Sequence, residues 1–230
     1  MNNFSIVIPI FNEQDNIKPL LDEIIFNLKI YDYEVVIVDD GSSDNSQSIL
    51  NAFVNYKNFC LLKNKTNLGQ SFSLVKGIKS CSYETIVTID GDGQNNPKDI
   101  KNILESYFSN QDLKLVGGIR TNRKDNIVKV FSSKIANFFR SKILKDNCLD
   151  TGCSLKVFDK KIFLSFPYFN GIHRFLPALF KGYGYKTFFI PVDHRIRKSG
   201  KSKYGTFNRL INGIIDIVRV ILIIRKNKKN

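Results

Sequence analysis

The chain has 230 residues, which is enough for one domain with a full hydrophobic core. Hydrophobic residues make up 43% and charged residues 24% of it, values that exclude an intrinsically disordered chain. The 35 Lys and Arg residues outnumber the 21 Asp and Glu residues, and this net charge of +14 indicates a polyanionic partner such as nucleic acid, a phosphorylated substrate or a membrane surface.

The positive charge is concentrated in two segments. Residues 114–145 hold nine Lys or Arg residues and one acidic residue, and residues 195–230 hold eleven and one. Each segment is either a solvated basic face or part of an anion-binding surface. The chain has two histidines and four cysteines, none in a CxxC pair, which argues against a thiolate–imidazole zinc site.

Short apolar runs alternate with helical patterns through the first half of the chain. Strands are expected over residues 4–10, 34–39, 59–63, 84–90 and 114–118. Helices are expected between them, over residues 14–28, 43–54, 70–79 and 97–108. This alternation predicts an α/β fold with a mostly parallel central sheet and helices on both faces.

The second half is less regular. It predicts a helix over residues 127–144 with a basic polar face, strands over 153–158 and 187–192, a helix near 174–180 and a last helix from Tyr204. The sequence shows neither a signal peptide nor a run of the roughly 18–20 apolar residues that span a bilayer. We therefore expect a chain on the cytoplasmic side.

Polar clusters follow three of the predicted strands directly. Asn12 and Glu13 follow the first strand, Asp39 and Asp40 the second, and the segment Asp90–Gln94 the fourth. Because ligands of open α/β sheets bind at the carboxyl ends of the strands, these clusters are expected to face one crevice. A carboxylate after the second strand is suited to accept a hydrogen bond from a base or a ribose hydroxyl, and the residues that follow it also suit a helix cap.

Asp90 and Asp92 are separated by one residue, and Gly91 and Gly93 allow a tight backbone there. Two carboxylates at this spacing can bind one hard divalent cation, to which Gln94 would add a neutral ligand. The ion, Mg²⁺ or Mn²⁺, would stabilise charge on a leaving diphosphate. The alternative is a solvated turn held by Asx hydrogen bonds. The other acidic strand ends favour the metal site.

Several motifs occur in an order that resembles a known enzyme family. Four segments of the first half are Val7–Glu13 (VIPIFNE), Val38–Ser42 (VDDGS), Asn67–Gly69 (NLG) and Asp90–Gln94 (DGDGQ). They are similar to the ordered motifs of family 2 glycosyltransferases. Three later segments are Gly118–Arg120 (GIR), Asp150–Lys156 (DTGCSLK) and Arg197–Lys203 (RKSGKSK). They are similar to the polyprenyl-phosphate branch, which includes dolichol-phosphate mannose synthase and bacterial undecaprenyl-phosphate glycosyltransferases. The likeness covers about residues 4–210. The chain departs from the pattern at Lys156, where many relatives carry Arg, and in lacking transmembrane helices after the catalytic domain.

The resemblance implies a nucleotide-diphospho-sugar transferase (GT-A) fold over residues 1–205 and an inverting, metal-dependent hexosyltransferase. It implies a UDP- or GDP-linked sugar as donor and a dolichyl or undecaprenyl phosphate as acceptor, on the inner face of the cell membrane. The metal would be held by Asp90, Asp92 and Gln94, and the acceptor phosphate by Arg120. The residues implied for nucleotide-sugar binding are Pro9, Phe11, Glu13, Val38, Asp40, Asp90, Gly91, Gln94, Arg197 and Lys203.

A lipid monophosphate is already an anionic nucleophile at neutral pH. The reaction then needs positioning and charge compensation more than a general base. Because Arg matches phosphate geometry better than Lys, Arg120 and Arg197 are the leading phosphate ligands, with Arg123 as a second candidate for the acceptor. Asp92, Arg120 and Asp150 are the expected catalytic residues. Asp150 either orients an arginine or the sugar, or forms a structural turn.

The end of the chain has a wide apolar face. Residues 210–224 include eleven apolar residues, and as a helix they are about 22 Å long, which is too short to cross a bilayer. Residues 206–230 are expected to form an amphipathic helix with a basic tail on an anionic membrane surface. The alternative is a helix docked on the domain or on a second copy of the chain. The helix over 127–144, with Lys129, Lys134, Arg140 and Lys142, is expected to form the other wall of a lipid-phosphate groove.

Two other functions compete with this interpretation. The closer one is a glycosyltransferase that uses a soluble or glycan acceptor. The other is a nucleic-acid-binding module, which the net charge alone suggests. The sequence shows no helix-turn-helix and no basic stripe interleaved with aromatic residues, and the acidic strand ends would repel nucleic acid. We therefore expect no nucleic-acid partner.

Overall fold

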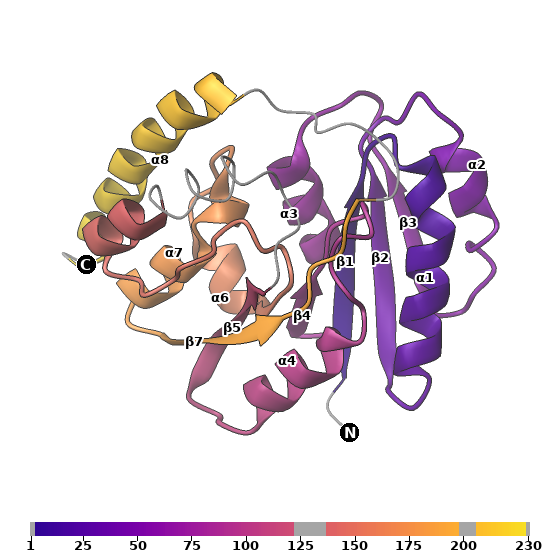
Figure 1. The fold of residues 1–230 in the computed structure, drawn as a ribbon, viewed down its shortest axis with the longest axis horizontal. Coiled ribbons are helices and arrows are strands. Elements are labelled where there is room, and N and C mark those ends of the chain that lie inside the picture. The colour runs from indigo at the N-terminus through magenta and orange to yellow at the C-terminus, as the bar shows by residue number, and fades with distance from the viewer. Residues whose placement is uncertain (1–2, 122–136, 198–205, 229–230) are drawn as a thin grey trace.

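The computed structural model describes residues 3–121, 137–197 and 206–228 (Figure 1). In the first half the elements are β1 (Phe4–Ile10), α1 (Gln14–Leu28), β2 (Tyr33–Asp39), α2 (Ser46–Asn51), β3 (Phe59–Lys63), α3 (Gln70–Ser80), β4 (Thr85–Thr88), α4 (Asp99–Phe108) and β5 (Leu113–Arg120). After a helix over residues 137–144, the second half contains β6 (Lys156–Asp159), α6 (Lys160–Ser165), η1 (Ile172–Arg174), α7 (Leu176–Gly182), β7 (Lys186–Val192) and α8 (Thr206–Asn227).

The described residues form one seven-stranded sheet in the order β3-β2-β1-β4-β6-β5-β7. Every strand runs parallel to the others except β6, which is antiparallel to both β4 and β5. The predicted α/β fold with a mostly parallel sheet is confirmed. The reversed strand has a consequence for the site. Because Lys156 at the start of β6 pairs with Thr88 at the end of β4, the segment before β6 enters the sheet at the edge where the parallel strands end.

Helices cover both faces of the sheet, as predicted (Figure 1). The period of two along β1 places Ile6 and Ile8 in one core cluster with α1, α2 and α4, and Val7 in a second cluster with α3, α6 and α7. The second face is tightly packed at Gly77 of α3, where an added Cβ would lie 2.6 Å from Val7. A sheet buried on both faces explains why its inner strands are nearly continuous apolar runs.

Some boundaries differ from those predicted. Helix α2 is shorter than the expected 43–54 helix, because residues 42–44 form the polar turn that leads into it. Strand β4 ends at Thr88, and β6 begins at Lys156 rather than at residue 153. At both ends the backbone leaves the sheet early because the Thr88 hydroxyl donates to the carbonyl of Ser154 at 2.6 Å, which joins the two segments outside the ladder.

The last helix, α8, packs on the domain through one buried acid and several aliphatic residues. Asp216 is buried and its carboxylate forms ion pairs of 2.9 Å with Arg174 and with Arg219. Val220 is fully buried, and an added Cβ at Gly182 of α7 would lie 2.4 Å from Ile224. The inner side of this helix therefore combines Asp216 with aliphatic residues, and a second aliphatic stripe faces outward. Among the described residues, no helix is both long enough and apolar enough to cross a membrane.

The structure corrects the expectation for one residue of the 127–144 helix. Arg140 is buried, and it pairs with the buried Asp146 and donates to the carbonyl of Cys148 at 2.5 Å. It shares the inner side of the helix with Leu144, one turn later, so it is not part of an exposed basic face. Lys142 is exposed as expected, whereas Lys129 and Lys134 lie outside the described residues.

Candidate active site

The carboxyl ends of the strands gather the predicted site residues at one edge of the sheet. Ile10 at the end of β1 pairs with Asp39 at the end of β2, and β4 ends beside β1. Strand β7 runs parallel to β5 and pairs Val192 with Arg120, so the segment after β7 also emerges at this edge. The site therefore combines loops after four parallel strands with the segment before β6.

Asp90 and Asp92 occupy the centre of this edge. The Asp90 Oδ1 accepts a hydrogen bond of 2.8 Å from the Gln70 side-chain amide, and the Asp90 backbone N–H donates to the Ser154 hydroxyl at 3.1 Å. The Gln94 N–H donates to Asp92 Oδ1 at 3.1 Å, which closes the turn that follows Asp92. Gly93 adopts a φ of +72°, a conformation that side chains rarely tolerate.

The electrostatics of this pair suit a divalent cation. Burial, and secondarily the charge of Asp92, raises the pKa of Asp90 to about 6. Burial likewise raises the pKa of Asp92, against the opposing effects of the Gln94 N–H and Arg197. Two adjacent carboxylates that resist ionisation are stabilised by a bound cation, and oxygen ligands suit Mg²⁺ and Mn²⁺. Among the described residues, no three His, Cys, Asp or Glu side chains gather into a metal-binding group. The amide group of Gln94 donates to the carbonyl of Arg195 at 3.4 Å.

Arg197 connects the last part of the site to the first. Its guanidinium donates to the buried Glu13 Oε1, and its Nη1 lies 3.9 Å from Asp92 Oδ2. The other oxygen of Glu13 accepts a bond of 2.7 Å from the Asn16 amide. The structure thus brings together Glu13, Asp92 and Arg197, which the sequence assigned to one site, across up to 184 residues of chain.

Asp40 holds the loop that precedes α3. Its carboxylate accepts three hydrogen bonds: 2.7 Å from the Asn64 amide, 2.9 Å from the Leu68 N–H and 2.8 Å from the Gly69 N–H. This network explains why an NLG segment follows the paired aspartates in the chain, because Asp40 positions that segment beside the site. Its predicted contact with the nucleoside is a separate role.

Asp39, which follows β2 with Asp40, is a further candidate that the nucleotide-binding assignment did not include. It is buried, and its Oδ1 accepts a bond of 3.0 Å from the Ser42 N–H. Its Oδ2 is also buried and has no hydrogen-bond partner among the described residues. A buried carboxylate oxygen without a partner is rare in folded proteins, and one beside a ligand edge suits a ligand N–H or O–H. The alternation of side chains along a strand could have indicated a separate role for Asp39, because Asp39 and Asp40 must point to opposite faces.

Arg120 and Asp150 form a part-buried bidentate ion pair. Arg120 Nε donates to Asp150 Oδ2 at 2.8 Å, Nη2 donates to Oδ1 at 2.7 Å, and the Arg120 backbone N–H adds a third bond of 3.1 Å. Gly152 makes room for the guanidinium, since an added Cβ would lie 2.6 Å from Arg120 Nη2. The Asp150 carboxylate is thus paired with an arginine, and its carbonyl also accepts the Cys153 N–H at 3.4 Å in a turn.

Sequence reasoning also missed two polar side chains that support Asp90. Gln70 is the first residue of α3 and donates to Asp90 directly. The Ser154 hydroxyl accepts from the Asp90 N–H and donates to the buried Asn95 side chain at 2.7 Å. No local pattern marks them, because their contacts with Asp90 and Asn95 span 20 to 64 residues of chain.

The remaining predicted residues lie as follows. Pro9 of β1 is paired in register with Val38 of β2, Phe11 follows β1 directly, and Gly91 is packed so closely that an added Cβ would lie 2.2 Å from the Ile10 side chain. Arg123 and Lys203 lie outside the described residues.

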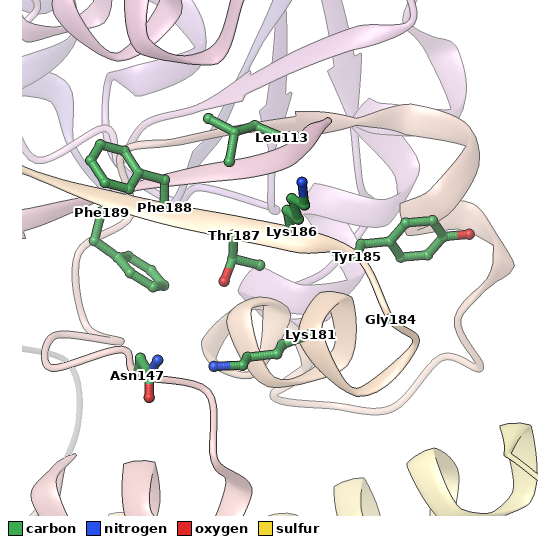
Figure 2. Close-up of a pocket in the computed structure, with 9 residues that line it drawn as sticks. All are labelled: Leu113, Asn147, Lys181, Gly184, Tyr185, Lys186, Thr187, Phe188 and Phe189. Atoms are coloured by element: carbon green, nitrogen blue, oxygen red, sulfur yellow. The ribbon is translucent and has the colours of Figure 1, made fainter. Parts of the chain in front are cut away.

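A cavity of about 640 Å³ lies elsewhere, between β7 and the end of α7 (Figure 2). It is lined by Leu113, Asn147, Lys181, Gly184, Tyr185, Lys186, Thr187, Phe188 and Phe189. Lys186 and Leu113 are at the amino ends of β7 and β5, whereas the candidate site is at the carboxyl ends. None of the predicted site residues lines this cavity.

Solved structures share this fold. Glucosyl-3-phosphoglycerate synthase from Mycobacterium tuberculosis, in complex with Mn²⁺, UDP and glucosyl-3-phosphoglycerate, aligns with a TM-score of 0.70 and 16% identity over 96% of this chain and 79% of that chain. A complex of the same enzyme with Mg²⁺ and UDP aligns with a TM-score of 0.69 and 15% identity, over 96% and 78% of the two chains. At this identity the likeness shows the fold, and the expected GT-A fold is confirmed.

Relatives in sequence are closer. The chain is 32% identical over 219 residues to an undecaprenyl-phosphate 4-deoxy-4-formamido-L-arabinose transferase of Yersinia pestis, covering 93% of this chain and 66% of that protein. It is 32% identical over 228 residues to the dodecaprenyl-phosphate galacturonate synthase of Rhizobium johnstonii, covering 96% and 67%. The chain thus spans about two thirds of the length of these relatives. The family model "Glycosyl transferase family 2" matches residues 5–165, and the chain belongs to this family.

Proposed function

We propose that this protein is an inverting, metal-dependent glycosyltransferase that moves a sugar from a nucleoside-diphosphate sugar to a polyprenyl phosphate. The observation that carries the proposal is the charge arrangement at the sheet edge. Asp90 and Asp92, which suit a bound cation, follow β4, and Asp92 lies near Arg197. Arg120, paired with Asp150, ends β5, which is separated from β4 by β6. The named activities of both sequence relatives, which use undecaprenyl and dodecaprenyl phosphate, support the choice of acceptor.

On the donor side, Asp90, Asp92 and Gln94 would hold a Mg²⁺ or Mn²⁺ ion, which supplies positive charge for the departing diphosphate. The complexes of the mycobacterial synthase with UDP and these ions support this assignment. Arg197 and Lys203 bind the donor phosphates. The nucleoside, uridine or guanosine, is bound by Pro9, Phe11, Glu13, Val38, Asp40 and Gly91.

On the acceptor side, Arg120 and Arg123 bind the phosphate of the lipid, and Asp150 holds the Arg120 guanidinium in its orientation. A phosphate oxygen of the acceptor attacks the anomeric carbon and forms the new C–O bond. The bond from that carbon to the diphosphate breaks on the opposite side, and its electron pair leaves with the nucleoside diphosphate. The configuration at the carbon inverts. No proton has to be removed from the nucleophile, so the arginines serve to position and to neutralise charge.

The protein acts at the inner face of the cell membrane as a peripheral protein, held there by α8. The outward side of α8 supports this location: Ile214, Ile215, Val218 and Leu222 are between 51% and 60% exposed. The exposed Arg225 and Lys226 at the end of the helix suit anionic headgroups. A helix of this kind lies in the interface instead of crossing it.

The test is a panel of UDP- and GDP-linked sugars, assayed with undecaprenyl phosphate and Mg²⁺ or Mn²⁺, and in parallel with free glycans as acceptors. We expect one donor to be consumed with the lipid phosphate, with formation of an anomerically inverted glycosyl lipid and loss of turnover in EDTA. Consumption of a donor only with a free glycan would show that the acceptor is a glycan and would contradict the proposal.

A further inference from the structure

The helix over residues 137–144 has the opposite arrangement to a normal surface helix, because it buries a charged side chain and exposes apolar ones. Its inner side carries Arg140, which is buried against Asp146, and Leu144. Its outer side carries Phe138, Phe139 and Ile143, which are between 51% and 60% exposed. A soluble helix normally buries its apolar stripe and exposes its charges. The 137–144 helix instead buries an ion pair and exposes two aromatic rings and an isoleucine.

Helix α8 independently exposes an apolar stripe. Its inner side holds the buried Asp216, with its two ion pairs, and the buried Val220, while its outward stripe is aliphatic. The two helices also belong to one part of the molecule. Leu144 and Val220, their inward apolar residues, belong to the same core cluster. Figure 1 shows both helices at the end of the long axis opposite α1 and α2.

The charges beside these exposed apolar residues indicate what the surface binds. Lys142 extends over the Phe138 ring with its ammonium 4.9 Å from the ring centre, and the α8 stripe ends at Arg225 and Lys226. Apolar side chains flanked by cations suit an anionic lipid monolayer, with side chains among the acyl chains and cations at the phosphates. A second copy of the chain would bring the same cations and a net charge of +14 to the contact, so like charges would oppose that pairing.

The surface also reaches the acceptor side of the candidate site. Leu149 is 60% exposed and directly precedes Asp150, whose carboxylate holds Arg120. A protein that rests on lipid through the 137–144 helix therefore holds the Arg120–Asp150 pair close to the headgroup layer. A phosphate attached to a membrane lipid could then reach Arg120 while its hydrocarbon chain stays in the bilayer.

We propose that the 137–144 helix is a second membrane contact, which inserts Phe138, Phe139 and Ile143 into an anionic monolayer and, together with α8, fixes the orientation of the active site. This proposal rests on the proposed function for the identity of the acceptor, but lipid binding itself does not depend on it. The helix acts as a positioning element and touches no reacting atom.

The decisive variant is Phe138→Ser with Phe139→Ser. Both side chains point outward, so the melting temperature should match that of the wild type. The matched control is Phe26→Ser with Ile30→Ser at the other end of the molecule. These residues are 71% and 63% exposed, and Lys29 lies over the Phe26 ring as Lys142 does over Phe138. Single Phe139→Ser provides a milder variant if the double variant unfolds.

Two measurements are made on each full-length protein. The first is binding to vesicles of equal parts phosphatidylglycerol and phosphatidylcholine, at low and high salt. The second is transfer to undecaprenyl phosphate embedded in these vesicles, compared with transfer to a water-soluble prenyl phosphate with two isoprene units. We expect the decisive variant to lose at least about tenfold in vesicle affinity and in transfer to the embedded acceptor. Transfer to the soluble acceptor should change less than about twofold, and the control should resemble the wild type in all assays.

The outcomes separate the two proposals. Unchanged vesicle binding in the Phe138/Phe139 variant overturns the inference, as does an equal loss with both acceptors, which would indicate damage to the active site. A wild-type dimer that the variant dissociates, with vesicle binding intact, overturns it in favour of an interface between copies. If the wild type glycosylates neither acceptor, the proposed function fails, and the vesicle-binding measurement still decides the role of this helix.

Discussion

Replacing Asp90 with Asn is expected to make the metal-free protein more stable at neutral pH. Burial and the charge of Asp92 raise the pKa of Asp90 from 3.8 to about 6. A difference of one in pKa corresponds to about 1.4 kcal/mol, so ionised Asp90 costs the folded state up to about 3 kcal/mol at pH 7. Asn removes the charge and keeps an oxygen for the Gln70 amide, so we expect a gain of about 1–3 kcal/mol in the free energy of unfolding.

The gain should depend on pH in a defined direction. Because the pKa of Asp90 is higher in the folded than in the unfolded chain, the folded wild type takes up this proton first as the pH falls. Its stability from this group therefore rises between pH 7 and pH 4 and is lost again as the pH rises through about 6. The advantage of Asp90→Asn should shrink over this range, to about 1 kcal/mol at pH 4.5, and be lost below about pH 3.

The assay is thermal unfolding in EDTA at pH 7.5, 6 and 4.5, followed by circular dichroism. For a chain of this length, a gain of 2 kcal/mol raises the melting temperature by about 4–8 °C. Adding Mg²⁺ and UDP should raise the melting temperature of the wild type but not of the variant. The matched control is Asp112→Asn, whose exposed carboxylate has its pKa lowered by Lys186. A variant no more stable than the wild type at pH 7.5, or an advantage as large at pH 4.5 as at pH 7.5, would refute the reasoning.

Three further substitutions test other parts of the site. Asp92→Asn should lower metal-dependent turnover by at least about a hundredfold with an unchanged far-UV spectrum, because it removes a ligand of the ion, and wild-type rates would dismiss the metal role. Gly152→Ala should raise the KM for the acceptor more than that for the donor, since the new methyl group would displace the Arg120 guanidinium. Gly213→Ala, where an added Cβ meets nothing within 4 Å, is its control, and equal kinetics of the two variants would contradict this role. Asp40→Asn should lower the free energy of unfolding in urea by about 1–3 kcal/mol and raise the KM for the donor. The reason is that an amide has one acceptor oxygen for the three donors that Asp40 now binds. An unchanged unfolding midpoint would contradict this expectation.

The sequence alone was sufficient for the layout of the donor side. Strand and helix periods are local properties, and in a parallel sheet every strand end lies at the same edge. For this reason Glu13, Asp40 and Asp90 could be assigned to one crevice from their positions after three apolar runs. The ordered motifs then indicated the family, and the relatives confirmed it. The individual roles of these residues stay predictions.

Partners distant in the chain could not be predicted in this way. Asp150 reaches Arg120 because β6 is antiparallel and delivers the segment before it to the site edge, and no local pattern reveals the direction of a strand. The same holds for Gln70 and Ser154 beside Asp90. The contacts of Asp150 and Ser154 depend on the direction of β6, and that of Gln70 depends on the packing of α3 against the sheet, so each is decided by the burial of a sheet face.

The orientation of α8 and of the 137–144 helix likewise depends on the tertiary structure. A helical wheel shows that α8 has a polar stripe and an apolar stripe, but the wheel is the same whichever stripe faces the core. Here Asp216 faces inward because Arg174, 42 residues earlier in the chain, lies where it can pair with the carboxylate. Arg140 is buried for the same reason, beside Asp146. The sequence determined that these helices are amphipathic, and only their packing on the domain decided which stripe is exposed, because Asp216 and Arg140 can be buried only beside their ion-pair partners.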